Sequence, residues 1–201
     1  IYVMWLADIP GIAGHLLAAS VMSAPGALVM AKIIYPETET SETMGEMKIT
    51  IEQKNTNAME ALGDGATIGL KLAANVGAML VAFVSLVAMI NYLLGFAGTS
   101  METILGFIFK PLAWTMGVPW SEAGTLGTLM GEKIVFTELI AYGHLKELMS
   151  SGAISDRTAI IASYALCGFA NFGSIGIQLG GIGGMAPERK KDLAKLVTKA
   201  M

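Results

Sequence analysis

The sequence predicts an all-α integral membrane protein with a re-entrant hairpin and a broken transmembrane helix. Three observations support this fold class. Apolar residues make up 54% of the 201 residues and charged residues only 14%, whereas soluble domains average roughly 45–50% and about 25%. The charges are clustered, since five of the 13 basic residues lie between 188 and 199. The segments between the clusters are apolar and long enough to cross a bilayer, which takes ~20 helical residues.

The same composition excludes several classes of protein. A net charge of −3 excludes a basic nucleic-acid-binding protein. His15 and His144 have no cysteine or histidine partner at ligand spacing, so no transition-metal site is expected. The glycine-rich stretch 180–184 lacks the Lys-Ser/Thr ending of a phosphate-binding loop. No catalytic triad is legible, and no organic cofactor is expected.

The N-terminal segment, residues 1–35, ends in a predicted transmembrane helix over about 15–35. Lys32 lies near the end of this helix, where its long side chain can reach the headgroups. Pro25 removes a backbone hydrogen bond near the middle, so a kink is expected. Residues 36–65 are polar and acidic and predict a loop on the aqueous side that can include a surface helix.

Residues 66–96 form the clearest predicted span. The segment is longer than a perpendicular crossing requires, so it is expected to tilt. Residues 101–117 have apolar side chains at helical spacing, interrupted at Lys110-Pro111. Trp114 favours the headgroup level, and this segment therefore predicts an interfacial helix.

Residues 122–150 are long enough to cross a membrane but contain ionisable side chains near their centre. Each central charge costs at least ~2.5 kcal/mol on insertion scales. Two half-length helices joined by a polar tip at 136–139 explain this pattern better than one span does, so a re-entrant hairpin is predicted. The ionisable side chains are Glu132, Lys133, Glu138 and His144.

Residues 156–185 predict a transmembrane helix that is broken near its centre. No charge occurs between 158 and 185, and seven glycines fall between 168 and 184. Such a helix is expected to unwind where the freed backbone faces a cavity. Residues 186–201 return to water with five basic side chains.

The basic residues predict the orientation in the membrane. If 122–150 re-enters, seven bases of loops and tail lie on one side and three on the other, whereas a complete crossing gives six and four. The positive-inside rule therefore favours the hairpin and places the 36–65 loop and the 186–201 tail in the cytoplasm.

Glu138 is the strongest candidate for a functional side chain. An ionisable group at membrane depth usually has a function, and a carboxylate at a hairpin tip can accept hydrogen bonds from a polar solute. The structural alternative is an ion pair with Lys133, five residues earlier.

Asn171, Ser174 and Phe169 are further candidates beside the expected helix break. An amide and a hydroxyl at positions i and i+3 can contact sugar hydroxyls or cap the two half-helices, and these roles are compatible. Phe169 can stack on a planar ligand, although packing against lipid or helices is the ordinary role of a phenylalanine.

Three stretches of the chain resemble the concentrative nucleoside transporter family. They are HLLAASVMSAPGALVMAKIIYPETE (15–39), GVPWSEAGTLGTLMGEKIVFTELIAY (117–142) and SYALCGFANFGSIGIQLGGIGGMAPERKKDLAKL (163–196). Together with the 55–95 region they cover nearly the whole chain, and the ALCGFANFGSIGI run is highly specific.

The resemblance implies a homotrimeric symporter built from two inverted repeats. The second repeat supplies a hairpin (about 122–150) and a broken helix (about 156–185), and its final helix is expected just beyond residue 201. Residues 15–35 correspond to the last helix of the first repeat, whose hairpin and broken helix are expected before residue 1. Residues 66–96 correspond to a long scaffold helix that contributes to the trimer contact.

The resemblance also implies roles for individual residues. Glu138, Asn171 and Ser174 match ribose-binding positions, and Phe169 matches an aromatic residue beside the nucleobase. Thr137 stands where the family usually has asparagine, which affects hydrogen bonding at the hairpin tip and bears on substrate preference. The sodium ligands are expected in the first repeat, outside this chain.

The implied function is uptake of nucleosides such as uridine, driven by a sodium or proton gradient, in the plasma membrane (the inner membrane of a bacterium). Two alternatives of other classes remain open at this point. One is an intramembrane enzyme with Glu138 as general base, and the other is a channel for small polar solutes lined by Asn171 and Ser174.

Overall fold

The computed structural model describes residues 2–38 and 57–201, and all their regular elements are helices. The all-α class is therefore confirmed for these residues. Most of the predicted 36–65 loop, residues 39–56, lies outside the described residues. The elements are α1 (Tyr2–Trp5), α2 (Ile12–Ile34), α3 (Ala58–Gly95), α4 (Met101–Thr115), α5 (Trp120–Val135), α6 (Glu138–Ser150), α7 (Asp156–Leu166), α8 (Phe172–Met185), the 3₁₀ turn η1 (Pro187–Arg189) and α9 (Lys190–Ala200).

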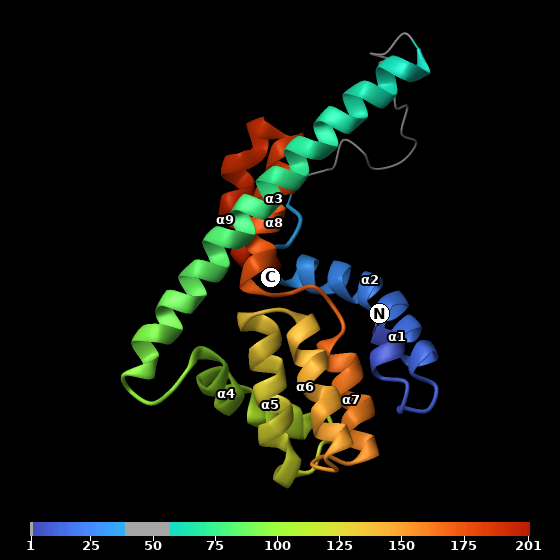
Figure 1. The fold of residues 1–201 in the computed structure, drawn as a ribbon, viewed down its shortest axis with the longest axis vertical. Helices are drawn as coiled ribbons and strands as arrows, with labels where there is room; N and C mark the ends of the chain where they lie inside the picture. Colours follow the sequence, from blue (N-terminus) through green and yellow to red (C-terminus); the bar gives the residue numbers. More distant parts are fainter. Residues whose placement is uncertain (1, 39–56) are drawn as a thin grey trace.

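The helices pack in two groups (Figure 1). In the first group α5, α6 and α7 lie side by side, with α4 against α5, α1 against α6 and α2 against α7. In the second group the long α3 packs along α8, and α9 packs against α8. The segment between α7 and α8 connects the groups, so the break in the predicted 156–185 helix lies at their junction.

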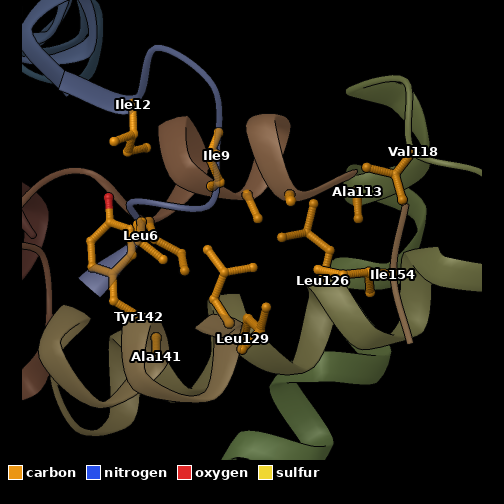
Figure 2. Close-up of a cluster of buried hydrophobic side chains, with 14 of the residues drawn as sticks. Leu6, Ile9, Ile12, Ala113, Val118, Leu126, Leu129, Ala141, Tyr142 and Ile154 are labelled. Carbon is orange, nitrogen blue, oxygen red and sulfur yellow. The ribbon is translucent and has the colours of Figure 1, made fainter. Parts of the chain in front are cut away.

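The hydrophobic core lies in the first group and holds the two arms of the predicted hairpin, α5 and α6, against α1 and α7 (Figure 2). Leu126 and Leu129 of α5 and Leu145 of α6 are buried in it. Tyr2 and Tyr142 also meet there, with ring centroids 4.6 Å apart. Burial stabilises by roughly 1.5–3 kcal/mol for each large apolar side chain, so this core positions the hairpin arms relative to the helix break.

Two helices of the described chain, α2 and α3, are long and apolar enough to span a membrane. In the isolated chain many of their apolar side chains are exposed, as Leu17 and Leu28 illustrate. This exposure suits helices that are surrounded by lipid or by further protein. Helix α2 begins at Ile12, three residues before the predicted start, and it continues through Pro25 without interruption.

Helix α3 begins at Ala58, eight residues before the predicted start at 66, so the end of the predicted loop is helical. The reason is an N-cap, because the Asn57 side chain accepts a hydrogen bond from the backbone N–H of Glu60 at 2.9 Å. A carboxylate in the first turn adds to this through the helix dipole. The polar composition of this turn placed it in the loop with at most a surface helix, whereas it is the first part of α3.

Helix α4 occupies the predicted interfacial segment 101–117 and continues through Lys110-Pro111. It packs closely against α5 because glycines leave room for the two backbones. A Cβ added at Gly106 would lie 2.8 Å from Thr128 Oγ1, and one added at Gly131 would lie 2.6 Å from the Glu102 carbonyl oxygen. These approaches make α4 and α5 one tightly packed pair.

We expect Gly131→Ala to lower the midpoint of thermal unfolding of the full-length protein. The new methyl group would meet backbone atoms of α4, and overpacking of this kind typically costs about 1–3 kcal/mol. Gly143→Ala in α6 is the matched control, since a Cβ there meets nothing within 4 Å and alanine is the better helix former. Equal midpoints for the two variants would contradict the close α4–α5 packing.

Candidate functional site

The tip between α5 and α6 lies at Phe136 and Thr137, inside the predicted polar tip at 136–139. The N–H of Phe136 donates to the Glu132 carbonyl oxygen at 2.8 Å and closes the last turn of α5. Thr137 is the N-cap residue of α6, and its side chain makes no capping hydrogen bond. Glu138 follows in the first helical turn, where the positive end of the helix dipole stabilises a carboxylate.

Glu138 is half-buried and only partly satisfied by hydrogen bonds. The Tyr2 hydroxyl donates to Glu138 Oε1 at 3.3 Å. The second oxygen, Oε2, is buried and has no hydrogen-bond partner among the described residues. Glu138 does not form the alternative ion pair with Lys133. Lys133 Nζ instead donates to the Ala165 carbonyl oxygen at 3.1 Å.

The break between α7 and α8 is held from the hairpin side. Two carbonyl groups in the last turns of α7 accept hydrogen bonds from hairpin side chains: Ser163 O from the Tyr142 hydroxyl at 2.7 Å, and Ala165 O from Lys133. Gly168 then has φ 116°, a conformation that side chains disfavour. These contacts satisfy backbone groups that an interrupted helix would otherwise leave unpaired.

Asn171 and Ser174 begin α8 with a capping box. Asn171 Oδ1 accepts from the Ser174 N–H at 2.8 Å, and the Ser174 hydroxyl donates to the Asn171 carbonyl oxygen at 2.6 Å. Both residues are buried. Capping thus accounts for the hydroxyl of Ser174, whereas Asn171 Nδ2 is buried without a partner among the described residues.

A cavity of about 250 Å³ lies between the hairpin tip and the break, close to the lower size of small-molecule sites, roughly 300 Å³. Of the sequence-predicted site residues, the cavity brings Glu138 and Phe169 together, and the Phe169 ring is 51% exposed. Thr137, Asn171 and Ser174 do not line it. The lining residues are Tyr2, Leu16, Ser20, Glu138, Tyr142, Cys167, Gly168 and Phe169.

Sequence reasoning missed several of these residues. The position of Tyr142 had a usable signal, because residues i and i+4 share a helix face and Glu138 begins the same helix. Tyr2 and Cys167 had none, since only the packing of α1 and the break places them at the cavity.

The two unpartnered atoms define what this site can do chemically. Glu138 Oε2 is an acceptor and Asn171 Nδ2 is a donor, and both are buried. A buried polar atom without a hydrogen bond costs about 1–3 kcal/mol. Hydroxyl groups can donate to the first atom and accept from the second, so the two atoms suit a polyhydroxyl solute, while the half-exposed Phe169 side chain offers an apolar face.

Comparison with known proteins identifies the family. The family described as "Na+ dependent nucleoside transporter C-terminus" matches residues 15–201. The chain is 46% identical over 195 residues to the uncharacterized transporter YutK of Bacillus subtilis, covering 93% of this chain and 48% of YutK. It is 43% identical over 197 residues to the nucleoside permease NupC of Helicobacter pylori, covering 93% of this chain and 46% of NupC.

Solved structures of the transporter CNTnw have the same fold. A doubly substituted CNTnw in an outward-facing state is 43% identical, with a TM-score of 0.82 over 97% of this chain and 49% of that one. CNTnw in an inward-facing, substrate-bound state is 46% identical, with a TM-score of 0.67 over 92% and 46%. The chain spans about half the length of these relatives. It belongs to the concentrative nucleoside transporter family, and it matches the C-terminal half of that family's members.

Proposed function

We propose that the full-length protein imports nucleosides across the plasma membrane by secondary active transport. The observation that carries this proposal is the pair of unpartnered atoms, Glu138 Oε2 at the hairpin tip and Asn171 Nδ2 at the start of α8. Ribose has hydroxyl groups that can donate to the carboxylate and accept from the amide, and the Phe169 ring can face the nucleobase. Ser174 supports Asn171 through the capping box, and Thr137 is proposed to contact the substrate from the hairpin tip.

The proposed topology follows from the same elements. Helices α5 and α6 form a re-entrant hairpin, α7 and α8 form the broken transmembrane helix, and the 186–201 tail is cytoplasmic. Substrate sites of transporters with inverted repeats lie near the bilayer midplane, where broken helices offer free backbone and polar side chains. Helix α3 is the scaffold helix of a homotrimer.

Sodium is the proposed coupling ion, because the matching family is described as Na+ dependent and a related mouse protein is named sodium/nucleoside cotransporter 1. Each sodium ion that enters releases about 2.3 kcal/mol per 100 mV of membrane potential, besides its concentration term.

Uptake of radiolabelled uridine into proteoliposomes that contain the full-length protein tests this function. A sodium gradient should drive accumulation above the external concentration, and a proton gradient alone should not. Accumulation driven by a proton gradient alone would show that the coupling ion is the proton and not sodium. Equilibration without accumulation would favour the channel, and recovery of a chemically altered product would favour the intramembrane enzyme.

We expect Phe169→Leu to lower nucleoside affinity severalfold with little change in the unfolding midpoint. Leucine keeps most of the apolar volume, so packing should change by under about 1.5 kcal/mol. Loss of a stacked ring should cost a further ~0.5–1.5 kcal/mol, by analogy with aromatic pairs. Competition by ribose, which has no planar ring, should be equal for wild type and variant. Unchanged affinity with a lower midpoint would place Phe169 in helix packing.

We expect Asn171→Ala and Ser174→Ala to differ in kind. Loss of the Asn171 side chain removes the N-cap of α8, which typically costs ~1 kcal/mol, and also the amide donor. It should lower both the yield of folded protein and uridine transport. Ser174→Ala keeps the backbone N–H that bonds Asn171 Oδ1 but removes the hydroxyl that bonds the Asn171 backbone, so it should mainly raise the half-saturating uridine concentration by loosening the Asn171 backbone. Equal losses of folded protein in the two variants would mean that the pair only caps the helix.

A further inference from the structure

A second cavity, of about 1190 Å³, lies between the C-terminal end of α2 and the helix α9, away from the candidate substrate site. Its charged lining is mostly basic. Two ion pairs occupy part of this lining: Lys32 Nζ with Glu37 Oε2 at 3.2 Å, and Arg189 Nε with Asp192 Oδ2 at 2.9 Å.

Two further lysines on α9 line the same cavity without an acidic partner among the described residues. Lys195 and Lys199 lie four residues apart and therefore on one face of the helix. Lys199 Nζ lies 5.4 Å from the centroid of the Tyr35 ring, which positions the ammonium group without neutralising its charge. After the two ion pairs, the cavity keeps an excess of two positive charges.

The rest of the lining is apolar and belongs in part to α2. Leu28 and Ile34 line the cavity and are 67% and 48% exposed. They continue the exposed apolar surface of a helix that is long enough to span a membrane. An apolar wall that leads directly into a basic rim matches an amphiphile with an alkyl chain and an anionic head.

We propose that this cavity binds an anionic phospholipid, with Lys195 and Lys199 holding the phosphate and the α2 wall holding an acyl chain. Basic pockets at the cytoplasmic ends of transmembrane helices attract anionic headgroups. A free phosphate ion would use only the rim, whereas a phospholipid uses the rim and the wall. The lipid ties α9 to the end of α2.

Thermal unfolding of the full-length protein in detergent tests the site. Dioleoyl phosphatidylglycerol should raise the unfolding midpoint more than dioleoyl phosphatidylcholine does, and inorganic phosphate should not reproduce the effect. The double variant Lys195→Gln/Lys199→Gln should lose at least half of the phosphatidylglycerol-specific rise. The control Lys190→Gln/Lys191→Gln removes the same charge from the same helix outside the cavity lining, and it should keep the rise.

Native mass spectrometry supplies a second readout that needs no unfolding transition. The wild type and the control should retain phosphatidylglycerol, the glutamine variant at 195 and 199 should retain less, and Lys195→Arg/Lys199→Arg should restore it. Equal retention by both glutamine variants, or an equal rise with inorganic phosphate, would overturn the proposal. So would a wild type that does not distinguish phosphatidylglycerol from phosphatidylcholine.

Discussion

Replacement of Glu138 by glutamine is expected to weaken uridine binding on the order of tenfold while the protein stays folded. Hydrogen bonds to a charged group contribute roughly 1.5–3 kcal/mol, against about 1 kcal/mol for neutral ones. A loss of about 1.4 kcal/mol is tenfold in affinity. Glutamine has the same shape, and its amide oxygen can still accept the hydrogen bond from Tyr2. The half-saturating uridine concentration for uptake and calorimetric binding to the full-length protein measure the effect.

Glu147→Gln is the matched control, because Glu147 lies on the same helix and is exposed. It should leave uridine affinity unchanged. Deoxynucleosides then identify the hydroxyl that Glu138 holds: the 2′- or 3′-deoxy analogue that lacks it should bind wild type and Glu138→Gln equally. Unchanged uridine affinity in a folded Glu138→Gln variant would remove this residue from the site.

Much of the helical pattern could be predicted from the sequence, because charge and glycine content act locally. Charges inside an otherwise apolar segment predicted the interruption between α5 and α6. The glycine-rich run that starts at Gly168 predicted a break, which the structure has at 167–171, just before the helical glycines of α8. Asn171 and Ser174 carry a capping signal in their i, i+3 spacing, and the capping box is present.

The partners of the site residues could not be predicted in this way, because they are distant in sequence. Tyr2 reaches Glu138 across 136 positions, and Lys133 reaches Ala165 across 32. Local spacing suggested that Lys133 would pair with Glu138, five positions away. In the structure the Lys133 ammonium group instead lies at the C-terminal end of α7. There it donates to a free backbone carbonyl group and interacts favourably with the negative end of the helix dipole. Only the packing of α5 against α7 makes that choice possible.

The second large effect is expected for Lys133→Met, which should lower the unfolding midpoint and also raise the half-saturating uridine concentration. Two contributions to the free energy of unfolding oppose each other. Removal of a half-buried cation relieves part of its desolvation cost. It also leaves the Ala165 carbonyl oxygen without its partner, at about 1–3 kcal/mol. Because Lys133 is only half-buried, its removal relieves only part of the desolvation cost. We therefore expect the unpaired carbonyl to dominate and the midpoint to fall.

The effect on transport follows from the position of the carbonyl. Ala165 lies two residues before Cys167, where the cavity lining begins, so a loosened end of α7 displaces the Cys167–Phe169 wall that faces Glu138. Lys133→Arg keeps a donor and a positive charge and should restore most of both properties. Lys146→Met removes an exposed lysine from α6 and should change neither. A lower midpoint with unchanged uridine affinity would show that this hydrogen bond stabilises the break without shaping the site. An unchanged midpoint would show that the desolvation cost of Lys133 offsets its hydrogen bond, and a higher midpoint would show that it outweighs the hydrogen bond.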